Sequence, residues 1–153
     1  MQQDNVLPEY GKASVDFMEK QNYRLYSDGA CRGNPGEGGA GAVITDAEGN
    51  AVWEGKEYLG HCTNNIAEYK ALILGLKGAL QEGYKKLYVY MDSELLAKQI
   101  NGSYKVKNEN LKVLMREVRS LLSSFESVQV KHVLRCHNAR ADKLANLAID
   151  INN

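Results

Sequence analysis

The chain has 153 residues, of which 44% are hydrophobic and 25% are charged, and its 19 basic and 19 acidic side chains cancel. This size and composition are typical of a single globular domain. Without net charge the protein has no global field of the kind that draws strongly basic proteins to nucleic acid, so such binding would depend on local patches. No apolar run approaches the roughly 20 residues of a membrane span, and we expect no membrane partner.

The N-terminal segment MQQDNVLPEYGK has neither the basic start nor the apolar stretch of a secretory signal, so we expect a cytoplasmic protein. Residues 1–21 match no regular pattern and are expected to form an extension, either helical or disordered, ahead of a domain over residues 22–153. The cysteines lack the CxxC spacing of a zinc site. We expect a monomer, in which at least one of the three is unpaired: Cys31, Cys62 and Cys136.

The first half of the domain reads as an antiparallel meander. Residues 23–27 alternate two kinds of side chain, as in a strand with unlike faces, and a glycine-rich loop over residues 28–38 follows. The segments GAGAVITD, AEGN and AVWEGKEYLG then predict a strand, a tight turn and a strand.

The second half alternates helices with strands. From Asn64 to Glu82 apolar residues recur at three- and four-residue steps, and Gly83 supplies a helix stop, which predicts a long buried helix. Strands are predicted at residues 86–91 and 127–133, and helices at 93–100, 110–125 and 139–150. The order βββαβααβα indicates an α/β protein with a mixed sheet flanked by helices.

Four acidic residues stand out because each lies beside the end of a predicted strand or the start of a predicted helix: Asp28, Glu68, Asp92 and Asp142. Each has a local explanation. Asp28 precedes a glycine, which is a common turn pair, and Asn65 and Glu68, in the first turn of the long helix, have the spacing of a capping box. Asp92 and Asp142 lie where a helix cap or the helix dipole favours a negative charge.

The combination of these residues predicts more than any one of them. The first and fourth strands both end in aspartate, and as parallel neighbours they would bring the two carboxylates together, since adjacent strands lie about 4.8 Å apart. Four carboxylates at one edge repel one another unless cations lie between them. Oxygen-only ligands with retained water favour Mg²⁺ or Mn²⁺ over zinc. The pattern therefore predicts a divalent metal site.

Four segments, in this order, resemble the signature segments of the type 1 ribonuclease H family: SDGACRGNPGEGGAGAVI, TNNIAEYKALILGL, YVYMDSELL and HNARADKLANLAI. The resemblance covers residues 22–151. It implies a ribonuclease H-like fold with a five-stranded mixed sheet, and an endoribonuclease that hydrolyses the RNA strand of RNA/DNA hybrids. It also implies two Mg²⁺ or Mn²⁺ ions held by the four carboxylates. One activates water and the other stabilises the leaving oxygen, which gives 5′-phosphate and 3′-hydroxyl ends.

The resemblance also implies residues that contact the substrate. In this family the asparagines of GNPG and TNN contact the hybrid from its minor groove, and the matching residues are Asn34, Asn64 and Asn65, with Cys31 and Thr63 beside them. An amide both donates to and accepts from a 2′-hydroxyl, the group that distinguishes RNA from DNA. The structural alternative is a turn at Asn34 and a helix cap at Thr63, Asn64 or Asn65, and both roles can coexist.

The auxiliary catalytic residue is where the chain departs from the family pattern. Bacterial members carry a histidine about ten residues before the last aspartate. His132 has that spacing, but VQVKHV places it at the end of a strand. His137 and Arg135 are comparable candidates, and some short archaeal-like members resemble this chain in having arginine there. The chain resembles a compact form without a basic protrusion or hybrid-binding domain, so we expect weak, salt-sensitive substrate binding.

Two other functions stay open at this point. One keeps the fold and changes the substrate to double-stranded RNA or a structured DNA, although TNN and GNPG favour a substrate with 2′-hydroxyls. The other is a catalytically silent nucleic-acid-binding module or the tail of a reverse transcriptase. The presence of all four acidic residues argues against a silent module.

Overall fold

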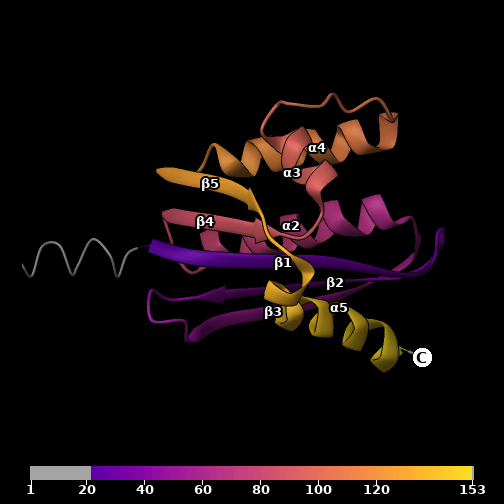
Figure 1. Cartoon of the computed structure of the whole chain (residues 1–153), viewed down its shortest axis with the longest axis horizontal. Coiled ribbons are helices and arrows are strands. Elements are labelled where there is room, and N and C mark those ends of the chain that lie inside the picture. Colours follow the sequence, from indigo (N-terminus) through magenta and orange to yellow (C-terminus); the bar gives the residue numbers. More distant parts are fainter. Residues whose placement is uncertain (1–21, 153) are drawn as a thin grey trace, which may run out of the picture.

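The computed structural model describes residues 22–152 (Figure 1). The extension expected over residues 1–21 lies outside the described residues. Five strands form one sheet in the order β3-β2-β1-β4-β5. The strands are β1 (Asn22–Gly33), β2 (Gly36–Thr45), β3 (Ala51–Cys62), β4 (Lys86–Met91) and β5 (Ser127–His132).

The sheet is mixed, as expected. β1, β2 and β3 form the predicted antiparallel meander, whereas β4 runs parallel to β1 and β5 runs parallel to β4. The helices follow the predicted order, with one added 3-10 turn. They are α2 (Asn64–Gln81), α3 (Glu94–Ile100), α4 (Glu109–Leu122), η1 (Arg135–His137) and α5 (Ala139–Asn152). Residues 101–108 alone join α3 to α4. None of the helices between residues 22 and 152 is long and apolar enough to cross a bilayer.

The main hydrophobic core lies between the sheet and the helices α2, α3 and α4. Leu25 of β1, Val89 of β4 and Leu72 of α2 are completely buried there. In β4 buried and partly exposed residues alternate, because successive side chains of a strand point to opposite faces. The fifth helix, α5, packs on the other face against β1, β2 and β3 (Figure 1). Each face of the sheet therefore has its own helical cover.

The prediction of a loop over residues 28–38 is wrong. β1 continues through Asp28 to Gly33 and pairs with β2 from Arg24 onward, and the turn between the two strands contains only Asn34 and Pro35. Glycines in this hairpin permit close packing of helices on both of its faces, because Gly29 meets α2 whereas Gly39 and Gly41 meet α5.

Candidate active site

The parallel part of the sheet brings two aspartates together. The last residue pair in the β1–β4 ladder is Ser27 with Met91, so Asp28 and Asp92 come next on the two strands. Asp92 follows the end of β4, but Asp28 lies inside β1 because that strand continues as a hairpin. Asp92 is not the helix cap considered above, since Ser93 accepts the hydrogen bond from the Leu96 amide. The expected meeting of the two strands is confirmed.

Glu68 reaches the same place from α2. It lies in the second turn of the helix, not the first, and the helix cap is Thr63, whose hydroxyl accepts a hydrogen bond from the Ile66 amide at 3.3 Å. The capping-box alternative is therefore wrong. The Glu68 carboxylate instead accepts a hydrogen bond from the Gly29 amide. A Cβ atom at Gly29 would overlap the backbone of α2 at Ala67, so glycine permits this approach.

Asp142 approaches from the opposite face of the sheet. It lies in the first turn of α5, as expected. α5 packs directly on β2, because a side chain at Gly39 or Gly41 would overlap backbone atoms of the helix. The buried Asn138, just before α5, donates a hydrogen bond to the Ser27 carbonyl at 2.8 Å and ties the start of the helix to β1. Asp142 thereby comes within hydrogen-bonding reach of Asp28.

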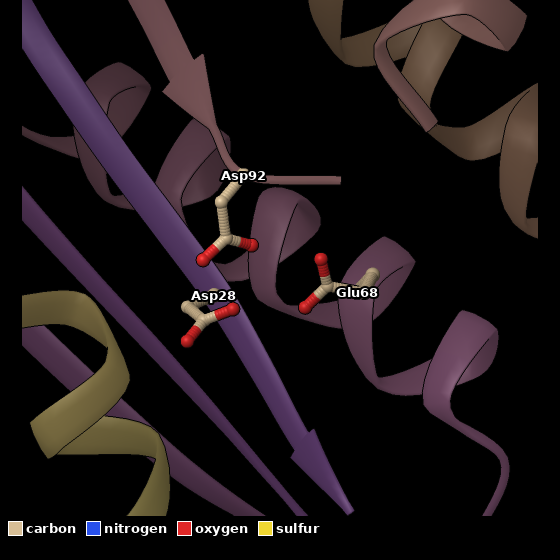
Figure 2. A group of neighbouring side chains, drawn as sticks. All are labelled: Asp28, Glu68 and Asp92. Carbon is tan, nitrogen blue, oxygen red and sulfur yellow. The ribbon is translucent and has the colours of Figure 1, made fainter. Parts of the chain in front are cut away.

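Three of the carboxylates converge closely. Ligand atoms of Asp28, Glu68 and Asp92 lie within 4.8 Å of one another (Figure 2). Burial, followed by the charge of Glu68, raises the pKa of Asp28 to about 10, and burial raises the pKa of Glu68 to about 7. One Asp92 oxygen is buried without a hydrogen-bond partner. A crowded set of hard oxygen donors with an unpartnered atom fits a divalent cation.

The structure separates the candidate auxiliary residues. The Arg135 guanidinium, which is 87% exposed, lies 3.8 Å from the Asp92 carboxylate and also lowers the pKa of Glu68. His137, two residues later, lines a cavity with Arg24 and Tyr26. His132 is exposed at the end of β5, as its sequence context predicted. Of these three side chains only Arg135 makes an ion pair with a carboxylate in the part of the chain that the structure describes.

The two asparagine segments lie side by side. The Asn34 side-chain oxygen accepts a hydrogen bond from the backbone N–H of Asn64 at 3.1 Å, so the β1–β2 turn is held at the start of α2. Thr63 is the helix cap, which confirms one of the structural alternatives for this segment. Asn34, Thr63 and Asn65 line one cleft of about 270 Å³. The structure thus gives these residues structural roles and also gathers them on one surface.

Comparison with known proteins identifies the family. A family model described as reverse transcriptase-like matches residues 26–148. Ribonuclease HI of Halobacterium salinarum is 41% identical over 125 residues, which are 82% of this chain and 63% of that protein. The solved structure of LC11-RNase H1 in complex with an RNA/DNA hybrid is 41% identical, with a TM-score of 0.81 over 85% of this chain and 98% of that chain. The chain belongs to the type 1 ribonuclease H family.

Some relatives are longer than this ribonuclease H chain. A bifunctional protein of Mycobacterium tuberculosis is 42% identical over 127 residues, which are 82% of this chain but only 35% of that protein. The chain thus spans about a third of that relative and under two thirds of the Halobacterium protein.

Two asparagines beside the candidate substrate surface escaped the sequence analysis. Asn108 and Asn110 line the same cleft as Thr63 and Asn65. Asn108 caps α4, because its side-chain oxygen accepts hydrogen bonds from the amides of Asn110 and Leu111. The sequence NEN before an apolar helix signalled the cap, but nothing local indicated that α4 begins next to α2.

Two of the three cysteines lie close together in the fold. Cys31 and Cys62 are neighbours, since the Cys31 thiol donates to the Cys62 carbonyl at 3.0 Å, whereas Cys136 is exposed in η1. Burial, and then the neighbouring Cys31, raises the pKa of the Cys62 thiol. All three cysteines are free thiols. Cys31 therefore lies at the foot of the turn that carries Asn34, as a neighbour of the candidate substrate surface.

Proposed function

We propose that this chain is an endoribonuclease that hydrolyses the RNA strand of RNA/DNA hybrids and requires a divalent metal ion. The convergence of Asp28, Glu68 and Asp92 is the single observation that carries the proposal. Membership of the ribonuclease H family and the likeness to a relative solved with an RNA/DNA hybrid support the choice of substrate.

The four carboxylates would hold two Mg²⁺ or Mn²⁺ ions. When bound, such ions supply an activated water for in-line attack on a phosphate and stabilise the charge on the leaving oxygen. The raised pKa values of Asp28 and Glu68 mean that both residues must release protons before they bind a cation. Cleavage on this pattern leaves a 5′-phosphate and a 3′-hydroxyl.

Arg135 and the asparagine segments would bind different groups of the substrate. The exposed Arg135 guanidinium lies beside Asp92 and is free to turn toward a phosphate, which it binds through several donors at once. Asn34, Asn64 and Asn65 carry amides suited to 2′-hydroxyl groups. Cys31 and Thr63 support the same surface. We rank Arg135 above His137 because His137 lines a separate cavity.

The decisive experiment compares labelled RNA/DNA hybrid, RNA duplex and DNA duplex in one assay with Mg²⁺, Mn²⁺ or a chelator. We expect cleavage of the RNA strand of the hybrid, and loss of that cleavage with chelator. Asp92→Asn serves as the inactive variant and Glu57→Gln, an exposed position on β3, as its matched control. Equal cleavage by wild type and Asp92→Asn would refute the proposal.

The assay also separates the alternatives. Preferential cleavage of RNA duplex or DNA duplex would favour a changed substrate, and binding without cleavage would favour a silent module. The likeness to a foamy virus protease-reverse transcriptase is 22% in sequence with a TM-score of 0.68 and shows the fold alone. The monomeric state and the cytoplasmic location stay predictions.

A further inference from the structure

One face of the sheet, over β1, β4 and β5, carries basic and aromatic side chains. Leu87, Val89 and Met91 of β4 point into the core, so the alternate residues of that strand lie on the other face. By the same alternation, the residues next to Leu25 in β1 and next to Val128 and Val130 in β5 also lie on that other face. The residues of this basic-aromatic face are Arg24, Tyr26, Lys86, Tyr88, Tyr90, Gln129 and Lys131.

The register of the strands sets these side chains in rows. Tyr26, Tyr90 and Lys131 are direct neighbours across the three strands, and Arg24, Tyr88 and Gln129 form the next row. The rings of Tyr26 and Tyr90 stack, with centroids 5.2 Å apart and an angle of 25° between their planes. On β1 this face thus has one cation, Arg24, and one ring, Tyr26. Asp28 follows two residues after Tyr26, beyond the point where Asn138 bonds to the Ser27 carbonyl.

No helix between residues 22 and 152 covers the part of this face over β4 and β5. The helix on this side, α5, packs against β1, β2 and β3, and Figure 1 shows β4 and β5 clear of it. Where α5 begins, a cavity of about 390 Å³ adjoins the face. Its lining includes Arg24, Tyr26, His137 and Arg140, with Glu48 as the one acidic residue. The cavity and the basic-aromatic face share Arg24 and Tyr26.

Basic side chains outnumber acidic ones in this region of the described structure. Among residues 22–152 the Arg24 side chain bonds to the carbonyls of Asp46 and Ala47, each at 3.4 Å, and to no carboxylate. Within residues 22–152 neither Lys131 nor Arg140 makes an ion pair. Rings flanked by free cations suit single-stranded nucleic acid, because bases stack on the rings while the cations contact phosphates.

We propose that the basic-aromatic face binds single-stranded RNA that continues from the strand held at the carboxylates. This inference rests on the proposed function, because Asp28 lies only two residues beyond Tyr26 on β1, so the RNA strand bound at the carboxylates is the strand nearest to this face. Tyr88 and Tyr90 stack with bases, and Arg24, Lys86 and Lys131 contact phosphates. The segments that carry Asn34 and Asn64 lie beyond the carboxylates, and so the duplex and the single strand occupy different surfaces.

The first test measures binding without chemistry. The full chain, in excess chelator, is titrated into a fluorescently labelled single-stranded oligoribonucleotide, and anisotropy reports the affinity. A second arm compares a blunt RNA/DNA hybrid with hybrids whose RNA strand extends at the 5′ end or at the 3′ end. We expect single-stranded RNA to bind, and one of the two extensions to tighten hybrid binding.

Two variants and a control assign the binding to the face. We expect Tyr88→Ala to weaken single-stranded RNA binding about tenfold through lost stacking. Lys131→Glu should lower the slope of log affinity against log salt by about one. Lys56→Glu changes another exposed lysine, on β3 at the opposite edge of the sheet, and should change neither quantity. Thermal unfolding checks that each variant folds. If Tyr88→Ala does not fold, Lys131→Glu still tests the proposal.

The results distinguish this inference from the proposed function. If the wild type cleaves a blunt hybrid with Mg²⁺ but binds no single-stranded RNA, or if the two variants match Lys56→Glu, the inference fails and the nuclease function stands. If the blunt hybrid is not cleaved, the proposed function fails, whatever the extension does.

Discussion

At the scale of single residues, the site is defined by carboxylates in an environment that disfavours their charge. Asp28 is only 6% exposed, and burial and its acidic neighbours raise its pKa. Asp92 keeps one buried oxygen without a hydrogen bond, with the Arg135 guanidinium 3.8 Å away. Such an arrangement is costly for folding alone, because a buried charge needs a partner and a buried acceptor needs a donor. A bound cation would offset both costs, because it neutralises the carboxylates and coordinates their oxygens.

Asp92→Asn tests this view of the carboxylates. We expect hybrid cleavage to fall about 100-fold or more, because one ligand charge is lost. In chelator, the unfolding temperature should stay the same or rise, since Asp92 raises the pKa values of Asp28 and Glu68. The Mg²⁺-induced rise in unfolding temperature should shrink. Calorimetry with and without Mg²⁺ measures both effects, with Glu57→Gln as control. A lower unfolding temperature in chelator would contradict the repulsion.

Arg135 and His137 allow a matched comparison within one short segment. Arg135→Ala should lower kcat/KM for the hybrid about tenfold, because its guanidinium lies 3.8 Å from Asp92 and faces solvent. His137→Ala should leave the rate within about twofold, because His137 lines a separate cavity. Steady-state cleavage at several pH values provides the readout. The reverse order of effects would assign the auxiliary role to His137.

At the scale of elements, close helix-to-strand contacts position the site. α2 lies against Gly29 of β1, and α5 lies against Gly39 and Gly41 of β2. Larger residues at these positions would push each helix outward by the width of a side chain. The two acidic residues on the helices, Glu68 and Asp142, would then move away from those on the strands. The glycines therefore link the packing of the fold to the geometry of its carboxylates.

Gly41→Ala is the corresponding experiment. The new methyl group would overlap the Ala141 carbonyl, so we expect a loss of about 1–3 kcal/mol in the free energy of unfolding and a lower Mg²⁺ affinity. Gly49→Ala is the control. It costs about 1 kcal/mol because Gly49 has a φ of 88°, but it touches nothing within 4 Å. Urea unfolding measures the stability of both variants, and Mg²⁺ titration measures their affinity for the ion. Equal Mg²⁺ affinity in both variants would show that α5 tolerates the shift.

At the scale of the whole molecule, the site couples protons, metal and stability. In the metal-free folded protein the pKa values of Asp28 and Glu68 lie above their usual values of 3.8 and 4.5. The folded state therefore binds more protons than the unfolded state above those usual values. Stability contributed by this difference is present at low pH and is lost as pH rises toward the folded-state values. Cation binding opposes the loss, because it favours the deprotonated, folded form.

Unfolding in chelator should accordingly show a stability that decreases with pH. Between about pH 5 and about pH 8 the folded state holds about one extra proton on Asp28 alone, so we expect the free energy of unfolding to fall by about 4 kcal/mol or more. Saturating Mg²⁺ should flatten or reverse this trend, and cleavage should rise with pH over the same window. Urea unfolding at a series of pH values measures the slope. A metal-free stability that rises with pH would contradict the raised pKa values.

Local chemistry determined the elements and the candidate residues. Apolar periodicity and Gly83 sufficed to predict α2, and alternation sufficed to predict β4, because both patterns depend on neighbours in sequence. The four carboxylates could be named from their motifs, and the convergence of three of them followed once β1 and β4 lay parallel.

Tertiary structure alone decided the rest. It kept Asp28 inside a strand, since the ladder with β2 continues past it, and it directed Glu68 to the Gly29 amide, away from the helix cap at Thr63. It also placed the Arg135 side chain beside Asp92 and the His137 side chain at a separate cavity, although only one residue lies between Arg135 and His137 in the sequence. The physical reason is that a side chain's direction depends on which distant element packs beside it. No pattern of neighbouring residues encodes that contact.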